Sequence, residues 1–213
     1  MAEITAQMVK ELREATGAGP LDCKKALMEN DGNLEKAIEY LRERGIAKAA
    51  KKLGAGRSMN EGVIEIYQHF NQRLGVMVEV NCETDFVAAT DTFKTFARDV
   101  ALQIANLAPQ YVTIEDVPES VAQEERRLQM RILKEDEKNA NKPDNILEKI
   151  IEGRMGKFYE EIVLMEQLFI KDDGKTISQL LAETVAELGE SIQIRRFSRF
   201  ELGGEDDDES ENE

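Results

Sequence analysis

The strongest constraint on the fold is an alternating segment, residues 74–82, that ends at a polar corner. If this segment forms a strand, side chains two apart share a face, and one face carries Val76, Val78, Val80 and Cys82. The chain then meets the turn-forming pair Thr84-Asp85, and a helix is expected only from about Phe93. Phe86 therefore stands in a corner between a strand and a helix. An aromatic residue there either caps the core or projects as a wedge, and the pattern allows both.

Two further segments show the same strand period. Residues 63–70 alternate and are followed by a predicted turn at Asn71-Gln72, so they are expected to form an antiparallel hairpin with residues 73–82. Residues 192–200 alternate as well, and their isolated position after several helices suggests that they return to pair with the hairpin. These patterns predict a small three-stranded antiparallel sheet.

Glycine residues divide the N-terminal part of the chain into three short predicted helices. They are expected at about 4–16, at about 20–30 and from Asn33 onward. This compact bundle resembles the ubiquitin-associated type of domain, which we assign to residues 1–45. Residues 46–57 hold four basic and no acidic side chains and are predicted to be a helical linker.

Residues 58–202 are predicted to form an α+β core that carries a long helical hairpin at about 119–169. The second hairpin helix is expected to present a coiled-coil-like stripe made of Leu147, Ile151, Met155, Phe158, Ile162, Met165 and Phe169. A weaker stripe on the first helix consists of Val121, Leu128 and Ile132. Such stripes serve either internal packing or dimerisation. Gly153 and Gly156 either weaken the second helix or allow a close approach.

Two more helices and a tail complete the prediction. Apolar stripes favour helices at about 93–105 and 177–188, with a turn region at 167–174. The C-terminal residues, 203–213, are too acidic and too poor in apolar side chains to fold.

Composition argues against several classes of function. His69 is the only histidine among 213 residues, which disfavours a histidine-based catalytic triad or a multi-histidine metal site. Cys23 and Cys82 lack neighbouring ligands and are expected to be buried free thiols. The chain also has no phosphate-binding glycine loop. We therefore expect no enzyme with covalent chemistry, no catalytic residues, no bound metal and no cofactor.

The net charge of −15 is unevenly distributed. Residues 1–57 carry a net charge of +2 and residues 201–213 a net charge of −8, which leaves −9 for the middle of the chain. Proteins that bind nucleic-acid backbones normally have a strongly basic face, so direct nucleic-acid binding is not expected. Because the start of the chain lacks the features of a secretory signal and no apolar run approaches ~20 residues, we expect a cytoplasmic protein without membrane contact.

Two motifs in this chain resemble those of the elongation factor Ts family. The first is LREATGAGPLDCKKAL at residues 12–27, and the second is EVNCETDFVA at residues 79–88. Tyr67-x-His69 and the segment EGRM at residues 152–155 are also similar to that family. The resemblance extends over nearly the whole chain apart from the acidic tail.

The resemblance implies a guanine nucleotide exchange factor whose partner is elongation factor Tu, bound to GDP or free of nucleotide. The wedge that would disrupt the partner's Mg²⁺ and phosphate site consists of Thr84, Asp85, Phe86 and Val87. The side chains that would dock on the partner's nucleotide-binding domain are Arg13, Pro20 and Leu21, and those that would contact its far domain are Tyr67 and His69. The chain looks like the short form of the family, which pairs with itself, so a homodimer in a 2:2 complex is implied.

The residues alone leave other interpretations open. Leu21 could be a core residue, Arg13 a solvated charge and His69 a structural hydrogen-bonding group. Two positions depart from the family pattern: Phe70 replaces a small residue, and residues 89–91 lack a basic side chain that many relatives have. The main rival function is a non-catalytic, ubiquitin-associated-like interaction module. Binding of RNA through the basic linker is a weaker rival.

Overall fold

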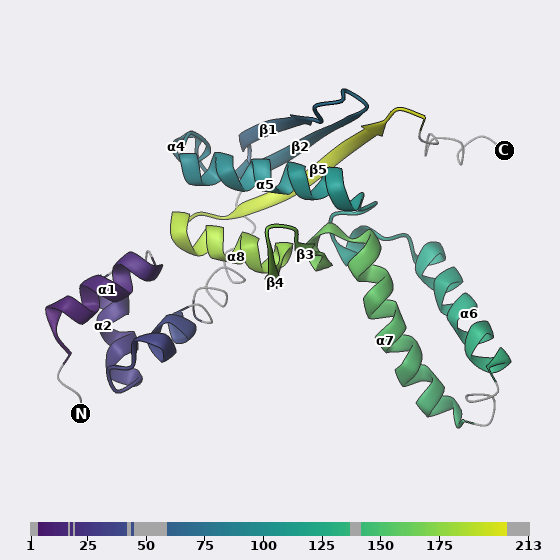
Figure 1. Ribbon diagram of the computed structural model, residues 1–213, viewed down its shortest axis with the longest axis horizontal. Helices are drawn as coiled ribbons and strands as arrows, with labels where there is room; N and C mark the ends of the chain where they lie inside the picture. The colour runs from purple at the N-terminus through teal and green to yellow at the C-terminus, as the bar shows by residue number, and fades with distance from the viewer. Residues whose placement is uncertain are drawn as a thin grey trace. The chain divides into compact units, whose positions relative to one another are not determined.

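Figure 1 shows the computed structural model, which describes residues 4–16, 18, 20–41, 44, 59–136 and 142–203. The fold is α+β, as the sequence predicts. The chain divides into two compact units, one made of Met1–Val63, Val80–Ala97 and Gln179–Gln193, and the other of Ile64–Glu79, Arg98–Ser178 and Ile194–Glu213. The predicted linker at 46–57 and the acidic tail after Gly203 lie outside the described residues. The domain boundaries proposed above stay predictions.

The N-terminal part contains the three predicted helical segments. They are α1 (Ala6–Thr16), α2 (Pro20–Glu29) and the helical residues 34–41. Asn33 caps the last of them, because its Oδ1 accepts a hydrogen bond from the backbone N of Lys36 at 3.0 Å. The small core of this part is formed by Leu12, Cys23, Ala26, Leu27 and Ala37. Cys23 is a buried free thiol, as expected.

The three-stranded antiparallel sheet has the order β1 (Glu61–Gln68), β2 (Leu74–Cys82), β5 (Ile192–Glu201). The last strand returns to pair beside β2, which confirms the predicted topology. Gly62 lets β1 approach β2 closely, since its φ is +146° and a Cβ there would collide with the carbonyl oxygen of Val80. The predicted apolar face of β2 is buried and consists of Val76, Val78, Val80 and Cys82.

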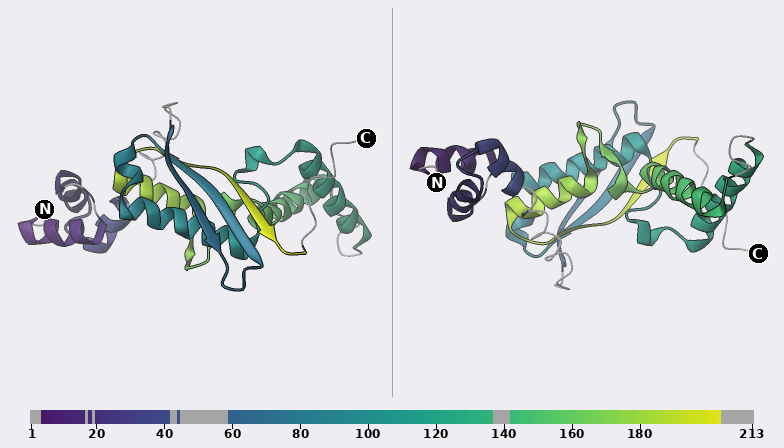
Figure 2. Two further views of the ribbon diagram at one scale, coloured as in Figure 1. Left: turned by 90° about the horizontal axis from the view of Figure 1, so that it is seen from above. Right: turned by 90° about the horizontal axis from the view of Figure 1, so that it is seen from below.

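Helices α5 (Asp91–Leu107) and α8 (Ile177–Leu188) confirm the two predicted core helices. Their buried side chains include Phe93, Phe96, Val100, Ile104, Ile177, Leu181 and Val185. Figure 2 shows both helices on one side of the sheet. The other side of the sheet carries exposed apolar side chains, namely Ile64, Ile66 and Met77, whose exposed fractions are 62%, 65% and 48%.

Helices α6 (Glu119–Glu135) and α7 (Asp144–Ile162) form the predicted hairpin (Figure 1). Its core consists of Leu133, Leu147, Ile151 and Met155. The stripe predicted on the second helix is wrong beyond Ile162, because Val163 takes an extended backbone with φ −110° and ψ 118°. Val163 forms a parallel bridge with Tyr111 instead of a further helical turn. Met165 and Phe169 therefore lie in other elements, the turn η2 (Leu164–Glu166) and the strand β3 (Leu168–Phe169).

The stripe predicted on the first hairpin helix is also wrong in part. Leu128 and Ile132 are 36% and 42% exposed, whereas Leu133 is fully buried and Met130 packs beside it. Neither predicted residue belongs to the buried cluster of the hairpin, because one position on a helix turns a side chain by about 100° and Leu133 takes the inward place. An added Cβ at Gly153 or Gly156 would meet nothing within 4 Å, so neither glycine serves a close approach.

The turn region predicted at 167–174 is instead a second, two-stranded sheet. Strand β3 pairs antiparallel with β4 (Asp172–Thr176). The buried amide of Gln103 supports it, since its Nε2 donates to the carbonyl oxygen of Leu168 at 3.0 Å and its Oε1 accepts from the backbone N of Ile170 at 2.9 Å. These strands are too short to show an alternating pattern in the sequence.

Candidate functional site

A four-residue helix, α4 (Asp85–Ala88), begins directly after β2. Thr84 is its N-cap residue: its backbone is extended, with φ −132° and ψ 153°, and its Oγ1 accepts a hydrogen bond from the backbone N of Val87 at 3.4 Å. The expectation that no helix begins before Phe93 was therefore wrong. The sequence pattern favours a turn at Thr84, but a threonine in that position caps a helix equally well.

Phe86 projects from α4 into solvent. Its side chain is 81% exposed, whereas Val87 and Ala88 in the same helix are each only 8% exposed. Asp85 is exposed as well. The alternative in which Phe86 caps the core is thereby excluded: one side of this short helix is anchored and the other presents an acid and an aromatic ring.

Two carboxylates bind the chain around α4. Glu190 accepts hydrogen bonds from the backbone N of Thr84 at 3.1 Å and from its hydroxyl at 2.8 Å. Glu83 accepts from the backbone N of Ser191 at 2.9 Å and from its hydroxyl at 2.7 Å. Glu190 and Ser191 are not predictable from the sequence, because no local pattern connects them to residues more than a hundred positions earlier. Only Gly189, which ends α8, signals a turn there.

Cys82 is a second anchor at this corner. Its side chain is fully buried, and its Sγ donates to the carbonyl oxygen of Thr84 at 3.1 Å. Burial raises the pKa of the thiol from its ordinary value of 9.0, because the thiolate would lose its hydration. Cys82 is thus a protonated structural thiol at neutral pH, in agreement with the expected buried free cysteine.

The N-terminal candidate residues lie on the surface of their own helices. Leu21 is 81% exposed, and Pro20 and Arg13 are exposed too. Cys23, two residues further along α2, is fully buried and belongs to the core of this part. The interpretation of Leu21 as a core residue is therefore wrong.

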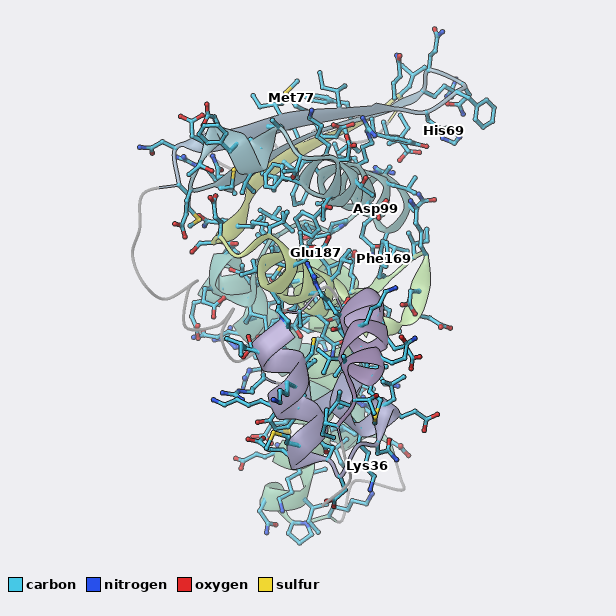
Figure 3. All side chains as sticks on the ribbon, turned by 90° about the vertical axis from the view of Figure 1, so that its left-hand side faces the viewer. Lys36, His69, Met77, Asp99, Phe169 and Glu187 are labelled. Carbon is cyan, nitrogen blue, oxygen red and sulfur yellow. The ribbon has the colours of Figure 1, made fainter. Side chains whose placement is uncertain are left out.

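Tyr67 and His69 are joined at the end of β1. The Tyr67 hydroxyl lies 3.0 Å from His69 Nδ1, and the His69 ring is 4.4 Å from the ring of Phe70, which is 88% exposed. Figure 3 shows His69 near the tip of the β1–β2 hairpin, with Met77 further along the sheet. The tight turn relies on Gln72, whose φ is +57°. His69 thus has a structural hydrogen bond and also sits at an accessible tip.

No helix in the described ranges is long and apolar enough to cross a bilayer. No group of three or more potential ligand side chains among those residues is arranged to hold a metal ion.

The fold and the site define an α+β protein that presents its candidate residues on exposed tips and helix surfaces. A family model described as elongation factor TS matches residues 3–204. The chain is 58% identical over 200 residues to elongation factor Ts of Carboxydothermus hydrogenoformans, covering 94% of this chain and 89% of that protein. It is 56% identical over 200 residues to elongation factor Ts of Thermoanaerobacter sp. (strain X514), covering 94% of this chain and 95% of that protein. It is 55% identical over 203 residues to elongation factor Ts of Desulfitobacterium hafniense, covering 95% of this chain and 91% of that protein. The chain belongs to the elongation factor Ts family, whose members are factors of translation elongation.

Proposed function

We propose that this protein is a guanine nucleotide exchange factor that acts in translation elongation in the cytoplasm. It binds elongation factor Tu carrying GDP and promotes the release of GDP, so that GTP can be loaded, without covalent chemistry of its own. The observation that carries the proposal is Phe86, an aromatic side chain 81% exposed on an anchored helix within the family motif. The assignment of elongation factor Tu as the partner rests on membership of the elongation factor Ts family.

In the proposed mechanism, the factor displaces groups in the partner's nucleotide site by inserting its own side chains. Asp85 and Phe86 enter the partner's nucleotide-binding domain and displace groups that hold Mg²⁺ and the phosphates. Mg²⁺ demands near-ideal octahedral geometry, so small displacements of its oxygen ligands weaken its binding. The nucleotide and the factor are linked, and each lowers the other's affinity by the same ratio.

The energy available from Phe86 limits what the wedge alone can do. Burying a phenylalanine side chain contributes about 1.5–3 kcal/mol. Each tenfold loss of nucleotide affinity requires about 1.4 kcal/mol, so Phe86 accounts for about one to two factors of ten. The remaining loss of nucleotide affinity comes from the surfaces that dock the factor on its partner. We assign docking on the nucleotide-binding domain to Arg13, Pro20 and Leu21, and contact with the partner's far domain to Tyr67 and His69.

We also propose that the protein is a homodimer that forms a 2:2 complex. The exposed sheet face supports this, because Ile64, Ile66 and Met77 are all on it and are about half to two thirds exposed. Glu79, on the same strand as Met77, forms an ion pair with Arg196 of β5 at 2.7 Å, so this carboxylate near the apolar patch is already paired.

The experiment that tests the function is the release of fluorescent GDP from purified elongation factor Tu of the same organism. The full chain is expected to accelerate release in proportion to its concentration until it saturates. The rival, a ubiquitin-associated-like interaction module, predicts binding to a partner with no change in the rate of GDP release. Absence of acceleration by folded protein contradicts the exchange function.

A further inference from the structure

We infer that Glu190 is a positioning residue for Phe86: it holds Thr84, and Thr84 sets the direction in which α4 presents the aromatic ring. The inference rests on the proposed exchange function, because it gives Glu190 a role in the action of the wedge. Nothing in the family motif at residues 79–88 includes Glu190, which follows α8 more than a hundred residues later.

The hydrogen bonds at Thr84 show how Glu190 acts. A threonine hydroxyl has one proton and two acceptor lone pairs. In Thr84 the hydroxyl lies 2.8 Å from Glu190 Oε1 and 3.1 Å from Oε2, so its proton points to the carboxylate. Its lone pairs are then left for the backbone N of Val87, at 3.4 Å, which is the capping bond of α4. Glu190 thereby orients the cap as well as binding it.

The same carboxylate also fixes the backbone where α4 begins. The backbone N of Thr84 donates to Glu190 Oε2 at 3.1 Å, so both donors of Thr84 bind one ionised group. Hydrogen bonds to a carboxylate are roughly twice as strong as those between neutral groups. The position and orientation of Thr84 are therefore set by a residue outside the helix.

Phe86 needs this external support because of where it stands. At 81% exposure, its ring receives little support from packing, so its direction follows from the backbone of α4. That helix has four residues, and such short helices are unstable by themselves. Val87 and Ala88 anchor one side, but the orientation of the first turn depends on its cap.

Glu190 is itself held in place on both sides. Gly189 takes φ +76° and closes the end of α8, with its backbone N bound to the carbonyl oxygen of Val185 at 2.9 Å. Ser191 is buried and bound twice by Glu83, which precedes Thr84 in the chain. The two carboxylates thus connect the segment 83–84 with the segment 190–191 by hydrogen bonds in both directions, and this pairing fixes the residue at which α4 is capped.

A matched control lies three residues earlier in the chain. Glu187 of α8 accepts a hydrogen bond from the hydroxyl of Thr92 at 3.2 Å, in an exposed position. The pair has the same chemistry as the pair of Glu190 and Thr84, but it supports α5 rather than the helix that carries Phe86. Removing either carboxylate separates one threonine–glutamate pair, and only the removal of Glu190 is expected to affect exchange.

The test compares Glu190→Ala, Glu190→Gln and Glu187→Ala in the full chain, with GDP release from elongation factor Tu measured over a range of factor concentrations. A misplaced wedge lowers the maximal rate, and we expect about tenfold or more for Glu190→Ala. The half-saturating concentration is expected to change little, since the docking residues are untouched. Glu190→Gln is expected to retain part of the rate, because its amide oxygen can still accept from Thr84. Glu187→Ala is expected to match wild type.

A double-mutant cycle separates positioning from a general loss of structure. If Glu190 acts through Phe86, adding Glu190→Ala to Phe86→Ala causes little further loss of maximal rate. An equal loss in both backgrounds overturns the inference, since the effect is then structural. Thr84→Val, which removes the hydroxyl and keeps the backbone N–H, supplies a second variant and is expected to lower the maximal rate in the same direction.

The outcomes distinguish this inference from the proposed function. If wild type accelerates release and Phe86→Ala impairs it, but Glu190→Ala and Thr84→Val both behave like Glu187→Ala, the positioning role is wrong and the exchange function stands. If wild type itself does not accelerate release, the proposed function fails first.

Discussion

Phe86 and Leu21 are each 81% exposed, although their neighbours Val87 and Cys23 are buried. An exposed apolar side chain adds little to folding and gains about 1.5–3 kcal/mol when a partner covers it. Truncation of either residue is therefore expected to change binding or exchange without unfolding the protein. This separation makes the proposed roles of single residues measurable.

Cys82 allows a prediction about pH at the residue scale. Burial raises the pKa of its thiol above the ordinary value of 9.0, so folding favours the protonated form. The corresponding stability is fully present below the unfolded pKa and is lost as the pH rises through the higher folded pKa. We expect the melting temperature of wild type to fall more steeply than that of Cys82→Ala as the pH rises above 9.0. Parallel pH profiles of the two proteins contradict this prediction.

At the scale of secondary-structure elements, long periodic segments were predictable and short ones were not. The burial of the apolar side of β2 and the span of α8 follow from one period maintained over many residues. Helix α4 and the strands β3 and β4 are too short to show a period, and long-range contacts such as those of Glu190 and Gln103 support them. Helix α7 ends at Ile162, next to the bridge between Val163 and Tyr111. No local sequence pattern predicts this bridge.

Two glycines, one just after a helix and one inside a helix, give opposite predictions for substitution by alanine. Gly189 has φ +76°, where a Cβ costs roughly 1–2 kcal/mol, so Gly189→Ala is expected to lower the free energy of unfolding by that amount. Gly153 lies inside α7 with nothing within 4 Å of an added Cβ, so Gly153→Ala is expected to stabilise by about 0.5–1 kcal/mol. Urea unfolding of the two variants and wild type measures both changes in the free energy of unfolding. Equal effects of the two substitutions contradict the assigned backbone conformations.

The corrected packing of the hairpin is tested by two leucines on α6. Leu133 is fully buried against α7, and Leu133→Ala is expected to destabilise by about 2–5 kcal/mol. Leu128 is 36% exposed, and Leu128→Ala is expected to cost about 0.5 kcal/mol or less. Chemical unfolding followed by circular dichroism measures the difference. A larger cost at Leu128 would restore the stripe predicted from the sequence.

At the scale of the whole molecule, the proposed roles fall on three segments of the chain. They are the N-terminal helices with Leu21, the corner with Phe86, and the β1–β2 turn with His69. The family motifs indicated all three from the sequence, and their exposure in the structure is compatible with binding. The sequence could not predict the hydrogen bonds that support this corner, because residues 83–84 and 190–191 lie more than a hundred positions apart in the chain.

The proposed homodimer leads to a prediction about mass in solution. Wild type is expected to sediment at about twice the chain mass of 24.1 kDa. Ile66→Glu places a charge on the exposed sheet face and is expected to shift the protein to the monomer. Ile146→Glu, at a residue of α7 that is 43% exposed, is the control and is expected to leave the dimer intact. A wild type that sediments at 24.1 kDa at all concentrations contradicts the dimer.

The most direct test of the wedge compares Phe86→Ala with Leu21→Ala, two truncations at equally exposed sites. The rate of GDP release from elongation factor Tu is measured against factor concentration for each. Phe86→Ala is expected to lower the maximal rate by about one to two factors of ten while the half-saturating concentration changes little. Leu21→Ala is expected to raise the half-saturating concentration and keep the maximal rate. If Phe86→Ala instead keeps the maximal rate of wild type, Phe86 is not the wedge.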